Sequence, residues 1–126
     1  MEGGRVHRLK PPFTQWPAAK NLGDMNSSNI TFQFTQLMGR ELKAIGINLD
    51  YAPCVDILMN DENEVIGDRA LSSDPDIVAK LSSAMVRGYI KSDVLRWFSL
   101  TISLIACVLL NRRGRIILFI ILYYLL

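Results

Sequence analysis

Apolar residues recur at three- and four-residue spacing between Ser28 and Ile45, which predicts an amphipathic helix over this range. Ser27 or Ser28 can accept hydrogen bonds from the free N–H groups of the first turn. Gly46 stands where a left-handed residue commonly follows the end of a helix. The predicted apolar stripe consists of Phe34, Leu37, Met38, Leu42 and Ile45.

A second helix is predicted to begin at Asp74-Pro75, with Asp74 as N-cap and Pro75 in the first helical position. Apolar residues then follow at helical spacing, and Gly88 lies near the predicted end. The stripe expected to be buried consists of Ile77, Val78, Leu81, Met85 and Tyr89.

The segment between the two helices predicts a short strand over 47–52, ended by Pro53, and a long polar loop over 53–73. A further strand is expected from about Val94. This order of helix, strand, loop, helix and strand favours an α/β fold with a parallel sheet and crossover helices. The loop follows the C-terminal end of its strand, the side on which α/β folds bind ligands.

The composition changes abruptly near residue 95. Residues 1–94 carry 10 Lys+Arg and 12 Asp+Glu, a net charge of −2, whereas residues 95–126 carry four arginines and no acidic residue, a net charge of +4. The chain as a whole, at +2, lacks the strongly basic character of most nucleic-acid-binding proteins, so no nucleic-acid partner is expected. We therefore expect two pieces, 1–94 and a hydrophobic tail at 95–126.

Two uncharged apolar runs, 97–110 and 116–126, make up most of this tail. A helix that spans a bilayer needs about 20 apolar residues, and neither run reaches that length alone. Three interpretations stay open: a frameshifted peptide, a membrane-associating segment within 97–126, and a genuine compact variant with two buried strands.

The two cysteines, Cys54 and Cys107, have no metal-ligand spacing and form no disulfide framework, which favours a reducing compartment. Cys54 is most simply interpreted as a small buried residue. No metal site is expected.

Three polar clusters could carry chemistry. The Glu2-Gly3-Gly4-Arg5 segment, with His7 and Arg8, could turn tightly and clamp a polar ligand, or be an ordinary frayed terminus. The Asp68-Arg69 pair could hold a loop in place or bind a ligand. Paired carboxylates serve glycoside hydrolysis, but an acidic loop can also be merely solvated; the acidic residues in question are Asp50, Asp56, Asp61, Glu62, Glu64 and Asp68.

Three segments together resemble one family. They are EGGRVHRLKPPFTQWPAA, MGRELKAIGINLDYAPCVDI and NEVIGDRALSSDPDIVAKLSSAMVRGY, in that order. They resemble the N-terminal part of the catalytic domain of glycoside hydrolase family 3, in its β-N-acetylhexosaminidase branch. The resemblance runs from Glu2 to about Val94 and stops where the composition changes.

The resemblance implies a partial (β/α)8 barrel, with about three β/α units present. It also implies a retaining enzyme that removes terminal, non-reducing N-acetylglucosamine with no cofactor. Bacterial members of this branch act in the cytoplasm on muropeptide fragments during cell-wall recycling. An N-acetylglucosamine-containing saccharide is therefore the expected ligand.

The resemblance assigns roles residue by residue. Arg8 and Arg69 match arginines that contact the bound sugar in the family. Asp56 matches the aspartate that follows the family's "AP-V" strand end and is expected to give structural support. Asp68 is expected to orient Arg69, and Glu2 and Arg5 match the opening motif and are expected to shape the loop.

The chain also departs from the family pattern. Met1 stands where the opening motif has Gln, so the sugar-binding Asp before it is missing. The family's "KHFPGH" motif, which leads to the acid/base histidine, has no counterpart, because neither Lys nor His occurs after Lys91. The family's nucleophilic aspartate also has no counterpart in this sequence. No catalytic residue is therefore expected here, and the chain is expected to be an inactive fragment; the alternative is a non-enzymatic, membrane-associated protein.

Overall fold

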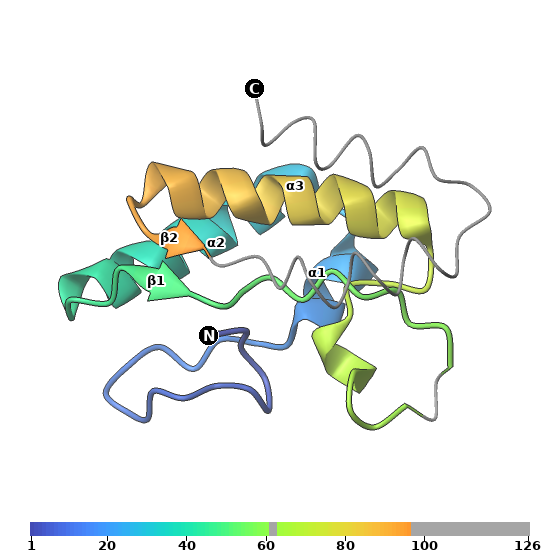
Figure 1. The fold of residues 1–126 in the computed structure, drawn as a ribbon, viewed down its shortest axis with the longest axis horizontal. Coiled ribbons are helices and arrows are strands. Elements are labelled where there is room, and N and C mark those ends of the chain that lie inside the picture. Colours follow the sequence, from blue (N-terminus) through green and yellow to red (C-terminus); the bar gives the residue numbers. More distant parts are fainter. Residues whose placement is uncertain (61–62, 97–126) are drawn as a thin grey trace.

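A computed structural model describes residues 1–60 and 63–96, and for residues 95 and 96 the backbone only. The predictions for residues 97–126 lie outside the described residues. Two long helices pack side by side, and a short parallel sheet lies along them (Figure 1). The elements in chain order are α1 (Ala19–Met25), α2 (Ser28–Ala44), β1 (Leu49–Asp50), the 3₁₀ turn η1 (Gly67–Arg69), α3 (Pro75–Lys91) and β2 (Leu95–Arg96).

The two long helices begin where the sequence predicts. The Ser27 hydroxyl accepts a hydrogen bond from the Ile30 N–H, and the Asp74 carboxylate accepts one from the Asp76 N–H. Pro75 opens α3, where a missing N–H costs nothing. Helix α2 ends at Ala44, one residue before the predicted end.

The buried face of α2 differs from the predicted stripe. Met38 and Leu42 are buried and Phe34 is half-buried, but Leu37 and Ile45 are exposed. The buried face includes two threonines, Thr31 and Thr35. Their hydroxyls donate to the Ser27 and Thr31 carbonyls, each at 2.8 Å, so no polar group is left unsatisfied there. The apolar pattern missed this face because its threonines satisfy their own hydroxyls within the helix.

Helix α3 buries the face that the sequence predicts, with Ile77 half-buried at its start. It approaches α2 closely at Gly88, where an added Cβ would lie 2.7 Å from the Phe32 carbonyl oxygen. At Gly39 of α2, an added Cβ would lie 2.7 Å from the Cβ of Ser92, the residue that follows α3. The fully or nearly fully buried residues of this face are Val78, Leu81, Met85 and Tyr89.

The sheet is parallel, as predicted. β1 pairs with β2, with Leu49 opposite Leu95 and Asp50 opposite Arg96, and α3 forms the crossover between the strands. The first strand is shorter than the predicted 47–52 range. Residues 1–60 and 63–96 form no closed barrel, and they contain these two paired strands. The α/β class is therefore confirmed, whereas η1 and α1 were not predicted.

The N-terminus lies close to β1 (Figure 1), and Leu9 and Trp16 of the same segment pack against the core cluster that contains Met38 and Leu42 of α2. The Met1 ammonium pairs with the buried Asp50 carboxylate, which also accepts a hydrogen bond from the Tyr89 hydroxyl at 3.0 Å. Trp16 packs edge-on against Phe34, with ring centroids 5.0 Å apart, and its indole N–H donates to Glu41 at 2.8 Å. The segment is therefore an ordered part of the fold and not a frayed terminus.

Within the described part of the chain, no helix is both long enough and apolar enough to cross a membrane.

Candidate functional site

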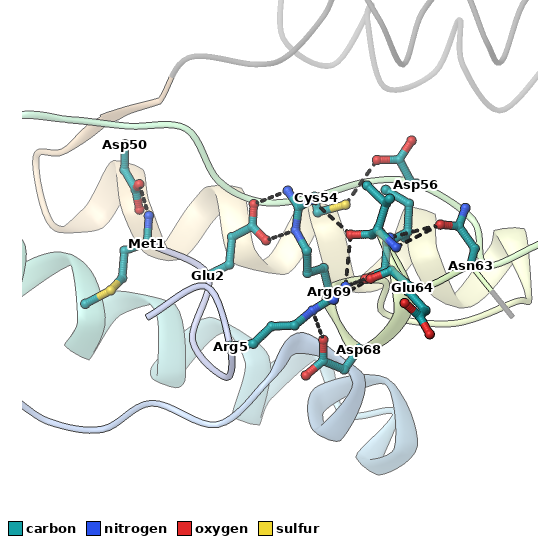
Figure 2. Close-up of polar contacts among 12 residues, drawn as sticks. Met1, Glu2, Arg5, Asp50, Cys54, Asp56, Asn63, Glu64, Asp68 and Arg69 are labelled. Carbon is teal, nitrogen blue, oxygen red and sulfur yellow. Dashed lines mark hydrogen bonds and ion pairs between the residues drawn. The ribbon is translucent and has the colours of Figure 1, made fainter. Parts of the chain in front are cut away.

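Glu2 and Arg69 meet across the fold, although 67 positions separate them in the sequence (Figure 2). The Arg69 Nε donates to Glu2 Oε2 at 2.6 Å, and its Nη2 donates to Oε1 at 2.9 Å. This two-point geometry is the strong form of an arginine–carboxylate contact. The hydrogen bond to Glu2 raises the pKa of Arg69, although partial burial acts in the opposite direction. Arg69 is therefore held as a fixed cation at the C-terminal end of η1.

Arg5 binds the backbone that precedes η1. Its guanidinium donates to the carbonyl oxygens of Glu64, Val65 and Ile66; the contacts from Nη2 to Val65 and Ile66 are both 2.9 Å. Its Nε also lies 2.8 Å from Asp68 Oδ1. The N-terminal segment thus supplies two side chains, Glu2 and Arg5, that hold the segment around η1 (Figure 2).

Asn63 shapes the start of the same turn. Its side-chain oxygen accepts from the N–H groups of Val65 and Ile66, at 3.1 and 3.2 Å, and its carbonyl accepts from the Gly67 N–H at 2.8 Å. Gly67 has a φ of +44°, a conformation that favours glycine. Sequence reasoning did not single out Asn63; its position four residues before the Gly of the GDR motif is the signal that would have found it.

Cys54 and Asp56 lie beside the Arg69 pair, after the end of β1. The Cys54 thiol donates to Asp56 Oδ2 at 3.0 Å. Burial, and secondly this hydrogen bond, raise the pKa of the thiol to about 12. Cys54 is half-buried, so the prediction of a small buried residue is only partly right. Asp56 acts here as the acceptor for the thiol, which fits a supporting role.

Arg8 shares none of the contacts described above for Glu2, Arg5, Asp68 and Arg69. Its side chain is exposed, and within residues 1–60 and 63–96 no ion pair or hydrogen bond of its side chain was found. The prediction that Arg8 contacts a sugar stays a prediction.

Some of the N–H groups of Arg69 make no hydrogen bond to the described residues. A guanidinium has five N–H groups, and the contacts to Glu2 and to the Val65 carbonyl, the latter at 3.3 Å, use three of them. Two N–H groups remain on a side chain that is 28% exposed. Such a group can donate to hydroxyl or amide oxygens of a ligand while Glu2 keeps it in place. No cluster of metal-ligating residues occurs among the residues for which the structure gives positions.

Residues 1–98 match the glycosyl hydrolase family 3 N terminal domain. A "Beta-hexosaminidase" from Hydrogenovibrio crunogenus is 44% identical over 93 residues, covering 69% of this chain and 26% of that protein. A "Beta-hexosaminidase" from Nitrosomonas eutropha is 36% identical over 94 residues, covering 70% of this chain and 27% of its own length. The chain thus spans about a quarter of the length of these curated relatives.

The fold is similar to solved structures from the same family. A glycoside hydrolase family 3 β-N-acetylglucosaminidase from Paenibacillus gives a TM-score of 0.73 at 35% identity, covering 76% of this chain and 18% of that one. NagZ from Neisseria gonorrhoeae, in complex with N-trifluoroacetyl-D-glucosamine, gives 0.67 at 33% identity, covering 73% of this chain and 29% of that one.

Proposed function

Because the chain belongs to glycosyl hydrolase family 3, we propose that residues 1–94 form part of the sugar-binding side of a β-N-acetylhexosaminidase barrel. The parallel β1–β2 pair, joined by α3, supports an origin in a (β/α)8 barrel, of which the chain would supply about three units. The observation that carries the proposal is Arg69, which Glu2 orients and whose two remaining N–H groups face no protein partner among the described residues.

The proposed ligand is a terminal, non-reducing N-acetylglucosamine. Its hydroxyl and acetamido oxygens accept hydrogen bonds, which suits the fixed donors of a guanidinium. The bound analogue of N-acetylglucosamine in the gonococcal relative supports this substrate class. Cytoplasmic recycling of cell-wall fragments is the proposed context, with the muropeptide sugar as substrate of the whole enzyme.

The 126-residue chain is proposed to bind this sugar without hydrolysing it. Retaining glycosidases need a nucleophile and an acid/base group about 5 Å apart. No Lys or His follows Lys91, and no acidic side chain follows Asp93. The motifs that carry these functions in the family therefore have no counterpart in this sequence.

Two measurements on the full chain test the proposal. Saturation-transfer NMR with N-acetylglucosamine is expected to give a signal from the acetamido methyl group. Arg69→Ala is expected to abolish the signal, because the orienting donors are lost. Arg40→Ala, which removes an exposed arginine of α2, is the matched control and is expected to leave it unchanged.

The second measurement is the release of a chromogenic aglycone from an N-acetylglucosaminide, for which no rate above the uncatalysed background is expected. Hydrolysis at the rate of a full-length relative would contradict the proposed absence of catalysis. A binding signal that is equal in the wild-type and Arg69→Ala chains would contradict the proposed site.

A further inference from the structure

Arg5 contacts the turn before Arg69 through several backbone hydrogen bonds in addition to its ion pair with Asp68. Three consecutive carbonyl oxygens, those of residues 64–66, accept from one guanidinium. In the ion pair with Asp68, the Arg5 side chain is 44% exposed and the Asp68 side chain is 40% exposed. Exposed pairs of this kind contribute little to stability. The backbone contacts are therefore what Arg5 chiefly provides.

The same contacts reach Arg69 directly. The Val65 carbonyl oxygen accepts from Arg5 Nη2 at 2.9 Å and from Arg69 Nη1 at 3.3 Å, so one oxygen joins the two guanidinium groups. Asp68, the neighbour of Arg69 in η1, pairs with Arg5 Nε. Arg5 thus holds both the carbonyl that Arg69 uses and the residue next to Arg69 (Figure 2).

The backbone at Gly67 fits tightly around this guanidinium. An added Cβ at Gly67 would lie 3.2 Å from Arg5 Nη2, closer than ordinary van der Waals contact. A lysine at position 5 would keep the positive charge. It would lack the planar fork of donors that serves three carbonyls at once.

We propose that Arg5 is a positioning residue for Arg69: it fixes the turn over 64–68 so that the Arg69 guanidinium is presented in one orientation to the sugar. The ligand in this statement rests on the function proposed above. The positioning itself rests only on the contacts of Arg5 with the turn.

The test compares Arg5→Lys with Arg40→Lys in the full chain labelled with ¹⁵N. In Arg5→Lys, the Arg69 Nε–H resonance is expected to shift, and the amides of Gly67 and Arg69 are expected to exchange about tenfold faster or more. The affinity for N-acetylglucosamine is expected to fall about tenfold, because the donors are no longer held in one geometry. The Tyr89 ring signals, which report on the packing of α2 and α3, are expected to stay as in the wild type, as they should in Arg40→Lys.

A second variant keeps the test decisive if Arg5→Lys does not fold. Arg5→Gln keeps a polar side chain of similar reach but loses the charge and the fork of donors, and it is expected to shift the same Arg69 resonance. An unchanged Arg69 Nε–H resonance and unchanged amide exchange in the folded variants would overturn the proposal.

The outcomes also separate this proposal from the proposed function. If Arg5→Lys loosens Arg69 but the wild-type chain binds no N-acetylglucosamine, positioning is upheld and the sugar site fails. If the wild-type chain binds the sugar and Arg5→Lys alters neither Arg69 nor the affinity, positioning fails and the site stands.

Discussion

At the scale of single residues, the described part of the site is a chain of charge and hydrogen-bond contacts. Glu2 holds Arg69, and Cys54 and Asp56 lie next to this pair. A half-buried thiol that donates to a carboxylate resists ionisation, since the thiolate would be both poorly solvated and repelled by the neighbouring charge. Cys54 therefore serves in this structure as a hydrogen-bond donor to Asp56.

The raised pKa of Cys54 predicts slow alkylation. The pKa is raised from 9.0 to about 12, so at pH 8 the thiolate population is expected to be about a thousandfold smaller than for an unperturbed thiol. Because the shift is upward, the labelling rate should still climb steeply with pH at pH 10, where an unperturbed thiol with a pKa of 9.0 would already approach its plateau. The rate of iodoacetamide labelling between pH 7 and 10, in a Cys107→Ser background, measures this.

Asp56→Asn supplies the matched variant for Cys54. It removes the carboxylate charge and keeps the shape of the side chain, so labelling at pH 8 is expected to accelerate, while burial still keeps it below that of a free thiol. Labelling of the wild-type Cys54 at the rate of a small thiol would contradict the raised pKa.

At the scale of elements, the close contact of α2 and α3 depends on small residues at the crossing. Gly88 lies against the Phe32 carbonyl, and Gly39 lies against Ser92, whose hydroxyl donates to the Gln36 carbonyl at 2.8 Å. In an exposed helix, replacing Gly by Ala stabilises by roughly 1 kcal/mol. At Gly88 the backbone of the other helix blocks the added methyl group, whereas at Gly39 the side chain of Ser92 does.

Gly88→Ala is therefore predicted to destabilise the fold by about 1–3 kcal/mol, the reverse of its effect on an isolated helix. The physical reason is that a backbone oxygen at 2.7 Å cannot move aside as a flexible side chain can. Urea denaturation followed by circular dichroism measures the change. Arg87→Ala, at an exposed position of the same helix, is the control and should change stability little. Stabilisation by Gly88→Ala would contradict the close packing of α2 and α3 at this position.

At the scale of the whole molecule, the two long helices of the described residues lie against the sheet, on the side where Asp50 contacts Tyr89 of α3. Parallel sheets in α/β proteins are normally covered on both faces. Leu49 of β1 is 36% exposed, whereas its neighbour Asp50 is buried against Tyr89. Among residues 1–60 and 63–96, β1 and β2 have no further paired strand, and open strand edges favour association.

We predict that the chain associates through the side of the sheet on which Leu49 is exposed, and that it therefore dissolves poorly. Leu49→Glu is expected to lower both self-association and the binding of an apolar dye, since it places a charge beside the exposed strand. Sedimentation velocity over a range of concentrations measures the association. Ile90→Glu, at an exposed site on α3, controls for added charge; an equal effect of the two variants would contradict association through the sheet.

The sequence by itself determined the two long helices, the N-cap of α3, the parallel order of the strands and the family, and it narrowed the N-cap of α2 to Ser27 or Ser28. These features rest on local signals, such as Ser27, Asp74-Pro75 and the period of the α3 stripe, or on continuous motifs. Helix α1 and the short turn η1 were missed because brief elements carry too few periodic residues.

The tertiary structure alone decided which groups meet at the site. The partners of Arg5 lie 59–61 positions away, and Glu2 lies 67 positions from Arg69. The family resemblance named Glu2, Arg5, Asp68 and Arg69 as site residues, but it assigned Asp68 to orient Arg69. The structure assigns that contact to Glu2, while Asp68 pairs with Arg5. The reason is physical: pairing over such separations depends on how α2 and α3 place the N-terminal segment against η1, which no local pattern encodes.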